Sequence, residues 1–265
     1  MTLKTRAGGK RVRVEHIYRY PVKGLSAESL SEVHLDVGEP LPGDRRFALA
    51  QGDAPFDEAA PTWLQKQHFA MLMQNERLAA LHAAWDDRRE VLIVRPPDGE
   101  ALTASTATPE GRDRIAAWLT AYLGPEARGR PRFVTSSGHS FSDHRNKVVS
   151  LINLASLASL EQAMGRTLDP LRFRANIYFS GLAPWAEFEW VGRTIELGGA
   201  TLTITKRIPR CPATEVNPVT ARRDCDPVQG LWDAFGHPDL GVYGRVEDSG
   251  RVAVGDSIVP REAAA

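Results

Sequence analysis

The chain has 265 residues, 42% of them hydrophobic, which is enough apolar material for one large domain or two smaller domains that share an interface. Lys plus Arg and Asp plus Glu both number 33, so the formal net charge is zero and excludes a general attraction to nucleic acid or to an anionic membrane. Two cysteines, Cys211 and Cys225, make neither a disulfide scaffold nor a zinc signature, and they indicate a reducing, cytoplasmic location.

The N-terminal half has the pattern of short strands separated by turns. Its first twenty residues are basic but lack the apolar core of a signal peptide, and no apolar run in the chain is long enough to span a membrane. Apolar residues then alternate with polar ones, first at Val12 and Val14 and again over residues 33–37. Residues 62–85 are ambiguous, because their leucine and methionine content favours a helix whereas Pro61 and the irregular apolar spacing favour loop and strand.

The stretch TPEGRDRIAAWLTAYLG, residues 108–124, carries the clearest helix signal. Thr108 can cap the helix, Pro109 suits its first turn and Gly124 can end it. The apolar side chains that fall on one face are Ile115, Trp118, Leu119 and Tyr122. We expect a domain boundary close to this helix.

The second half is predicted to be mostly strands, with two further helices. One helix runs from about residue 153 to residue 164, and the other lies in DPVQGLWDAFG, where apolar residues at helical spacing predict a face that packs on the core. The stretch RTIELGGATLTIT predicts a hairpin that turns at Gly198 and Gly199. Few helices, many short strands and frequent Gly and Pro predict a β-rich α+β fold of barrel or sandwich type.

The stretch RIPRCPATEVNP, residues 207–218, sets Cys211 between two prolines and beside Arg210. Positive charge favours the thiolate, which is a soft ligand for a redox-active metal, and proline stiffens the loop. The chain lacks the fingerprints of nicotinamide, P-loop, zinc-protease and α/β-hydrolase sites, and its seven histidines have no ligand spacing. By itself, however, a cysteine is more often an inert buried thiol, and Lys23 or Arg45 a solvated loop charge.

Seven short motifs follow one another in a specific order. They are YPVKG from residue 20, GDRRF from 43, SD from 142, RFRAN from 172, RCPATEVNP from 210, GVYGRV from 241 and GRVAVGDSIV from 250. Their order and spacing resemble the molybdenum cofactor sulfurase C-terminal (MOSC) family, over roughly residues 11–260. The resemblance implies an N-terminal MOSC-type β-barrel domain, residues 10–105, packed on a C-terminal MOSC β-barrel, residues 125–262, with the cofactor cleft between them.

Within this family the chain resembles the bacterial and mitochondrial amidoxime-reducing molybdoproteins. That resemblance implies a molybdenum-molybdopterin cofactor, whose anionic phosphate needs a local set of cationic side chains in a chain without net charge. The matching positions are Lys23, Arg45 and Arg174 for the pterin and its phosphate, Asn176 and Thr214 for the lining of the site, Asp143 in a matching loop, and Cys211 as catalytic molybdenum ligand.

Some residues depart from the family pattern or lie outside it. Gly24 replaces a small hydroxyl residue, Ala175 a proline and Asn217 an aspartate, so one phosphate contact is expected to be missing. Lys66 lies in the ambiguous region and matches no motif, and Cys225 is interpreted as structural.

The implied function is that of an oxidoreductase that reduces small N-hydroxylated or N-oxide substrates. Because the chain has no nicotinamide, flavin or iron–sulfur motif, the electrons are expected from a separate donor protein. The alternative is a carrier of molybdenum cofactor or of sulfur, with a persulfide on Cys211. A third hypothesis is a barrel that binds no cofactor and serves as an interaction module.

Overall fold

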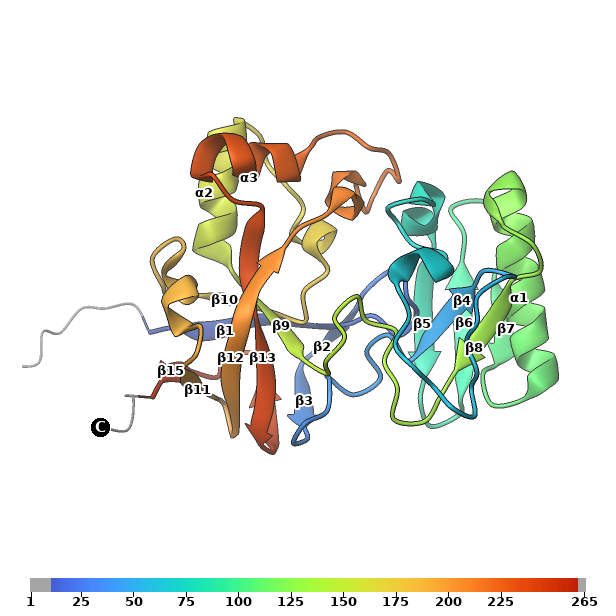
Figure 1. Ribbon diagram of the computed structural model, residues 1–265, viewed down its shortest axis with the longest axis horizontal. Coiled ribbons are helices and arrows are strands. Elements are labelled where there is room, and N and C mark those ends of the chain that lie inside the picture. Colours follow the sequence, from blue (N-terminus) through green and yellow to red (C-terminus); the bar gives the residue numbers. More distant parts are fainter. Residues whose placement is uncertain (1–10, 262–265) are drawn as a thin grey trace, which may run out of the picture.

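The computed structural model describes residues 11–261, and these form a β-rich fold with three α-helices, as the sequence predicts (Figure 1). The strands are β1 (Arg13–Arg19), β2 (Glu28–Leu30), β3 (Glu32–Leu35), β4 (Phe47–Ala50), β5 (His82–Asp86), β6 (Val91–Arg95), β7 (Leu102–Ser105), β8 (Arg132–Thr135), β9 (Val149–Asn153), β10 (Ile177–Ser180), β11 (Thr194–Leu197), β12 (Ala200–Pro209), β13 (Asp239–Asp248), β14 (Gly250–Ala253) and β15 (Ile258–Pro260). The α-helices are α1 (Pro109–Leu123), α2 (Leu154–Met164) and α3 (Pro227–Phe235). In this part of the chain no helix has the length and apolar character needed to cross a membrane.

A curled sheet of eight strands forms the larger part of the molecule. Its order is β15-β11-β12-β13-β9-β10-β1-β2, and every neighbouring pair is antiparallel except β9 and β10. A parallel pair needs a long crossover connection, and α2 lies in that connection. Buried side chains such as Val14, Phe179, Leu202 and Val242 pack together on this sheet.

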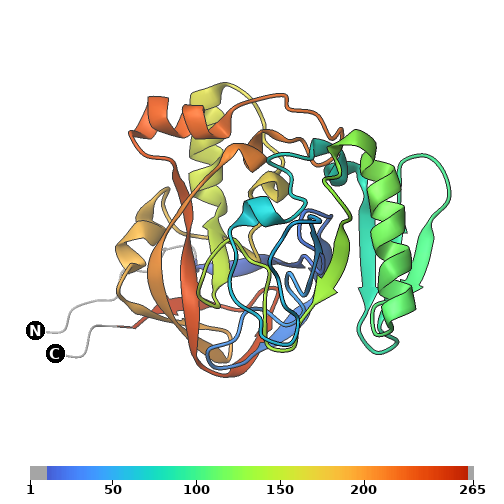
Figure 2. The same ribbon diagram turned by 45° about the vertical axis from the view of Figure 1, so that its right-hand side comes forward.

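The smaller part consists of the sheet β5-β6-β7, the pair β4-β8 and helix α1, which packs on β7 and β8. Figure 2 shows α1 and this small sheet at one side of the molecule. The predicted cap of α1 is confirmed, because Thr108 Oγ1 accepts a hydrogen bond of 3.1 Å from the Gly111 amide and Gly124 follows the last turn. Ile115 and Leu119 bury the predicted apolar face.

Strands from the N-terminal and C-terminal halves of the sequence pair with one another. β1 and β2 come from the start of the chain but extend the large sheet, where Ile17 pairs with Ile177. β3 pairs with β14, and β8 returns to pair with β4. The boundaries at residues 10–105 and 125–262 stay a prediction, but these pairings hold the start of the chain against its second half.

Two local expectations are resolved by the packing. Residues 62–85, all within the described chain, form two 3-10 turns (Lys66–His68 and Glu76–Ala80) and strand β5, so the helical reading is wrong. In α3 the buried face is narrower than predicted, because the helix lies on α2 through Gly230 and leaves Trp232 51% exposed.

Gly241 offers a test of the contact between β13 and β9. Its φ is +83°, and an added Cβ would lie 2.4 Å from the Leu151 carbonyl oxygen. We expect Gly241→Ala to destabilise the fold by about 3 kcal/mol, from backbone strain plus overpacking. Gly236 has a similar φ of +72° with open space around it, so Gly236→Ala should cost only about 1 kcal/mol. Urea unfolding of both variants measures the difference, and equal losses would contradict the packing argument.

Candidate functional site

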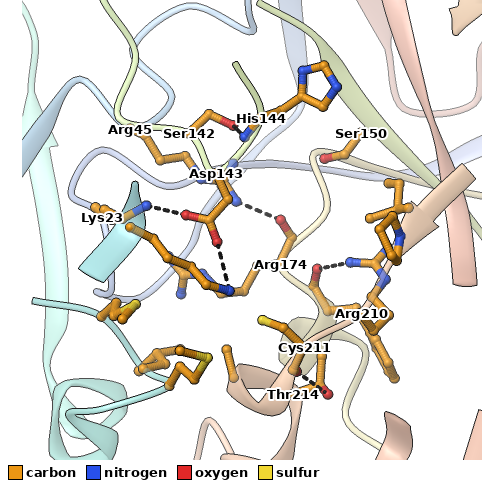
Figure 3. Close-up of a pocket in the computed structure, with 18 of the residues that line it drawn as sticks. Lys23, Arg45, Ser142, Asp143, His144, Ser150, Arg174, Arg210, Cys211 and Thr214 are labelled. Carbon is orange, nitrogen blue, oxygen red and sulfur yellow. Dashed lines mark hydrogen bonds and ion pairs between the residues drawn. The ribbon is translucent and has the colours of Figure 1, made fainter. Parts of the chain in front are cut away.

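A cavity of about 610 Å³ lies where the two parts of the molecule meet (Figure 3). Its walls come from the loops after β1, β3 and β8, the segment 63–73, the turn before β10 and the end of β12. Every residue that the sequence assigned to the site lines this one cavity: Lys23, Arg45, Asp143, Arg174, Asn176, Cys211 and Thr214. Their roles stay predictions, but the fold brings the set together from five separate stretches of chain.

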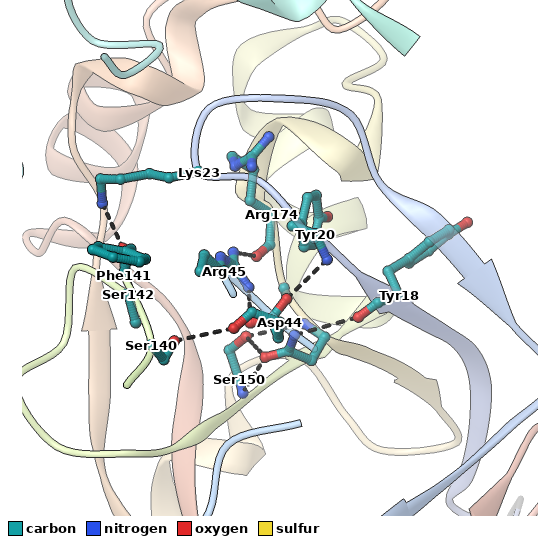
Figure 4. A network of polar contacts seen from close by, with 12 residues as sticks. Tyr18, Tyr20, Lys23, Asp44, Arg45, Ser140, Phe141, Ser142, Ser150 and Arg174 are labelled. Atoms are coloured by element: carbon teal, nitrogen blue, oxygen red, sulfur yellow. Dashed lines mark hydrogen bonds and ion pairs between the residues drawn. The ribbon is translucent and has the colours of Figure 1, made fainter. Parts of the chain in front are cut away.

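The cationic wall is built around the buried ring of Tyr20 (Figure 4). The Cζ atoms of Arg45 and Arg174 lie 4.4 and 4.3 Å from the centre of this ring. Both arginines have left-handed backbone conformations, with φ of 48° and 51°, which are unfavourable for residues other than glycine. Burial raises the pKa of Tyr20 to about 12, although the charges of the two guanidinium groups lower it. The Tyr20 side chain is therefore neutral.

The two guanidinium groups differ in their partners. Arg45 pairs with Asp44, and its Nη2 donates to the carbonyl of Arg174 at 2.7 Å. Arg174 Nη1 donates to the carbonyl of Leu25 at 2.7 Å, whereas its Nη2 is buried and has no hydrogen-bond partner among residues 11–261. Burial and the like charge of Arg45 lower the pKa of Arg174 to about 10. An anion in the cavity would offset this cost and accept a hydrogen bond from the free Nη2.

Asp143 lies beside Lys23 and Arg45 in the cavity (Figure 3), and Lys66 is near its other carboxylate oxygen. The buried Lys23 ammonium pairs with one of its carboxylate oxygens and donates to the Phe141 carbonyl at 2.9 Å, and Lys66 lies 3.8 Å from the other oxygen. Burial raises the pKa of Asp143, but the lysines outweigh it and the net shift is downward. Burial lowers the pKa of Lys23 in spite of Asp143. The Asp143 carboxylate therefore forms ion pairs with the ammonium groups of both Lys23 and Lys66.

Cys211 stands at the end of β12, where a 3-10 turn begins, and Thr214 Oγ1 donates to its carbonyl at 3.0 Å. Arg210 lies close enough to Cys211 for their charges to interact, as the sequence predicts, but its N–H groups are used elsewhere. Arg210 donates to the carbonyls of Phe173, at 2.8 Å, and Leu240, at 2.9 Å, and so fixes the loop.

Lys66 is a further cation near Cys211 in the cavity, and the sequence reasoning left it out of the site. Burial lowers the pKa of Lys66, but the negative charges of Cys211 and Asp143 outweigh burial, and the pKa is raised. The segment around Lys66 has no periodicity or motif, so only the arrangement in space identifies it.

The amide of Asn176 is used inside the protein. Its Oδ1 accepts from the Ser150 amide at 3.1 Å and from Ser150 Oγ at 2.8 Å, and its Nδ2 donates to the Tyr18 carbonyl at 3.3 Å. Asn176 therefore ties together β9, the end of β1 and the turn that carries Arg174.

Two further arginines fix the loop after Cys211. Arg172 is buried, pairs with Asp224 at 2.6 Å and donates to the Glu215 carbonyl at 2.9 Å. Arg223 donates to the carbonyls of Pro212, at 3.1 Å, and Met73, at 2.8 Å. The loop is thus held to the smaller part of the molecule.

Positive charge exceeds negative charge along the cavity wall. Seven cationic side chains line it, against the two carboxylates of Asp44 and Asp143. Asp224, outside the lining, pairs with Arg172. A partly enclosed excess of cations is costly without a counter-ion, so the donor set fits an anionic ligand beside a thiol. Residues 11–261 contain no group of three or more His, Cys, Asp or Glu side chains able to hold a metal.

Comparison with known families agrees with the motifs. Residues 11–126 match the model described as the MOSC N-terminal beta barrel domain, and residues 137–259 match the MOSC domain. The chain belongs to the MOSC family. The two matches follow one another without overlap and cover most of the described chain.

Several relatives carry informative names. Molybdenum cofactor sulfurase of Danio rerio is 27% identical over 69% of this chain and 25% of its own length. Mitochondrial amidoxime-reducing component 1 of Mus musculus is 28% identical over 56% of this chain and 52% of its own, and that of Homo sapiens 27% over 66% and 67%. The chain thus spans a quarter of the sulfurase and about half of the mouse relative. The structure of the YUAD protein from Bacillus subtilis is 16% identical, covering 95% of this chain and 97% of that one with a TM-score of 0.46.

The Asp143 pairing predicts a competition with bound anions. We expect Asp143→Asn to tighten the binding of inorganic pyrophosphate to cofactor-free protein by about threefold to tenfold, because the anion no longer displaces a carboxylate from Lys23. Isothermal titration calorimetry measures the affinity. Asp87→Asn removes the same charge from outside the cavity and should leave the affinity unchanged. Weaker binding by Asp143→Asn would mean that Asp143 orients Lys23 for the anion.

Proposed function

We propose that this protein binds molybdenum-molybdopterin in the cavity, with Cys211 as the protein ligand of molybdenum. Lys23, Arg45 and Arg174 are assigned to the anionic pterin and its phosphate. The observation that carries this proposal is the excess of cations around one thiol, with Arg174 Nη2 buried and unpartnered. Thr214 lines the site, and Asn176 supports it through Ser150.

For the activity, we propose the reduction of small N-hydroxylated or N-oxide compounds. When bound, the cofactor supplies two-electron chemistry, in which an N–O bond is cleaved and water is released. The sequence given has no motif for a cofactor that could deliver these electrons, and we propose that a separate protein donates them. The names of the amidoxime-reducing relatives support this choice. A cytoplasmic location remains part of the proposal.

A second function is favoured by a different observation. The relative named as a sulfurase, together with the Lys66 ammonium beside Cys211, would also suit a carrier of molybdenum cofactor, or of sulfur as a persulfide on Cys211. An ammonium stabilises a thiolate or persulfide through its charge. The carrier would bind without turnover of its own.

Molybdenum content tests the ligand assignment. Protein made in cells that synthesise the cofactor should contain about one molybdenum per chain, and Cys211→Ser should lose most of it, because a serine hydroxyl is a harder ligand and is not ionised at neutral pH. Cys225→Ser is the matched control and should retain the metal, since Cys225 does not line the cavity. Elemental analysis that finds equal molybdenum in wild type and Cys211→Ser would defeat the assignment.

Turnover separates the reductase from the carrier. Molybdenum-loaded protein with reduced viologen as donor should oxidise it when benzamidoxime is added, and Cys211→Ala should abolish this oxidation while it keeps the wild-type melting transition. The artificial donor replaces the missing partner. Loaded protein that is inactive with a panel of N-oxygenated compounds, yet transfers its cofactor to an apo-molybdoenzyme, would establish the carrier instead.

A further inference from the structure

One contiguous segment, residues 63–73, forms a second wall of the cavity and contributes mostly uncharged side chains. Trp63, Lys66 and the run Met71, Leu72 and Met73 all line the cavity. No motif of the sequence assigned any of them to the site. The cavity wall therefore includes side chains beyond those expected to hold a cofactor.

Two contacts fix where this wall runs. A Cβ added at Gly24 would lie 3.4 Å from the Ala70 carbonyl oxygen and 3.6 Å from Met71 Cα. The segment therefore packs closely on Gly24, the residue next to Lys23. Its other end is held by Arg223, which donates to the carbonyls of Leu72 and Met73, at 3.1 and 2.8 Å, and to that of Pro212. Residues 71–73 thus bridge from Lys23 to the neighbour of Cys211.

The side chains of this wall suit an uncharged ligand with an apolar body. Methionine side chains are flexible and polarisable, and they adapt to flat or irregular apolar groups. Lys66 supplies a charged hydrogen-bond donor close to the Cys211 sulfur and to Asp143. Trp63 adds a buried Nε1 donor that has no partner within the described part of the chain. A ligand seated here meets apolar surface on one side and donors on the other.

The charge of the cavity also selects between substrate and product. An amidoxime is a weak base and is uncharged near neutral pH, whereas the amidine left after reduction is a strong base and carries a positive charge. Reduction of an amidoxime consumes two electrons from the donor protein and three protons, cleaves the N–O bond, and releases water and an amidinium cation. The Lys66 ammonium, which lines this part of the cavity and is not assigned to the cofactor, repels that cation.

We propose that Lys66 and residues 71–73 form a substrate subsite beside Cys211 for uncharged N-oxygenated compounds with an apolar body. The N–O oxygen accepts a hydrogen bond from Lys66 Nζ, and the apolar body lies on Met71 and Met73. The same ammonium disfavours the cationic product and promotes its release. This inference rests on the proposed reductase function and assigns a residue outside the predicted set.

The test compares molybdenum-loaded wild type with Lys66→Met and Lys66→Arg. Lys66→Met should raise the KM for benzamidoxime about tenfold, from the loss of a charged hydrogen bond. It should also tighten inhibition by benzamidine at least about threefold, because a like charge is removed, while inhibition by neutral benzamide should tighten less or weaken. Lys66→Arg should restore both values towards wild type. A merely structural role would not move substrate and product in opposite directions.

The apolar wall has its own comparison. Met73 is only partly buried, so Met73→Ser is expected to fold, and it should reduce the preference for benzamidoxime over acetamidoxime, which lacks the aromatic body. An unchanged preference would remove the methionine wall from the subsite. Opposite shifts with Lys66→Met and a reduced preference with Met73→Ser together support it.

The remaining outcomes are also decisive. If wild type turns over benzamidoxime but Lys66→Met changes neither constant, or shifts both in one direction, the subsite is wrong and the reductase stands. If wild type is loaded with molybdenum but inactive, the proposed reductase function is wrong. The same Lys66 variants are then compared by their dissociation constants for benzamidoxime and benzamidine, measured by tryptophan fluorescence. Wild type that binds neither compound would overturn the subsite.

Discussion

The stacking of two guanidinium groups on the buried ring of Tyr20 is the interaction on which the cavity depends. Arg45 and Arg174 repel one another, and burial strengthens that repulsion because water no longer screens it. The ring attracts both cations through the negative charge on its faces, and hydrogen bonds to backbone carbonyls hold each group in place. A concentrated positive charge is thereby held ready for an anion.

The position of Tyr20 beside Arg174 depends on the pairing of β1, from the start of the chain, with β10, from its second half. Tyr20 directly follows β1, and Arg174 precedes β10. The antiparallel pairing of β1 with β10 therefore sets two residues that are more than 150 positions apart on opposite sides of one contact. The strained backbones of Arg45 and Arg174 persist because the surrounding sheet and hydrogen bonds determine their positions.

The departures from the family pattern have local physical explanations. Gly24 has a φ of +86°, and an added Cβ would lie 3.1 Å from Leu78, so the glycine allows the segment around Ala70 to approach. Ala175 has a backbone N–H, which a proline would lack, and donates it to Tyr178 Oη at 3.2 Å. The Asn217 side chain accepts from the amide of Val219 and donates to Asp224, so it shapes the loop after Cys211.

The sequence by itself determined the β-rich fold, the capped helix from Thr108 to Gly124 and the set of residues that meet in the cavity. The fold and the helix follow from local signals, since caps and alternation are each present in a short stretch of chain. The set of site residues follows from the resemblance of the ordered motifs to the MOSC family. Only the tertiary structure decided that Lys66 joins Arg210 near Cys211, that the Arg210 N–H groups go to backbone carbonyls, and that Trp232 is half exposed. The direction of a long side chain depends on which carbonyls and charges the rest of the fold brings within its reach, and those partners lie far away in sequence.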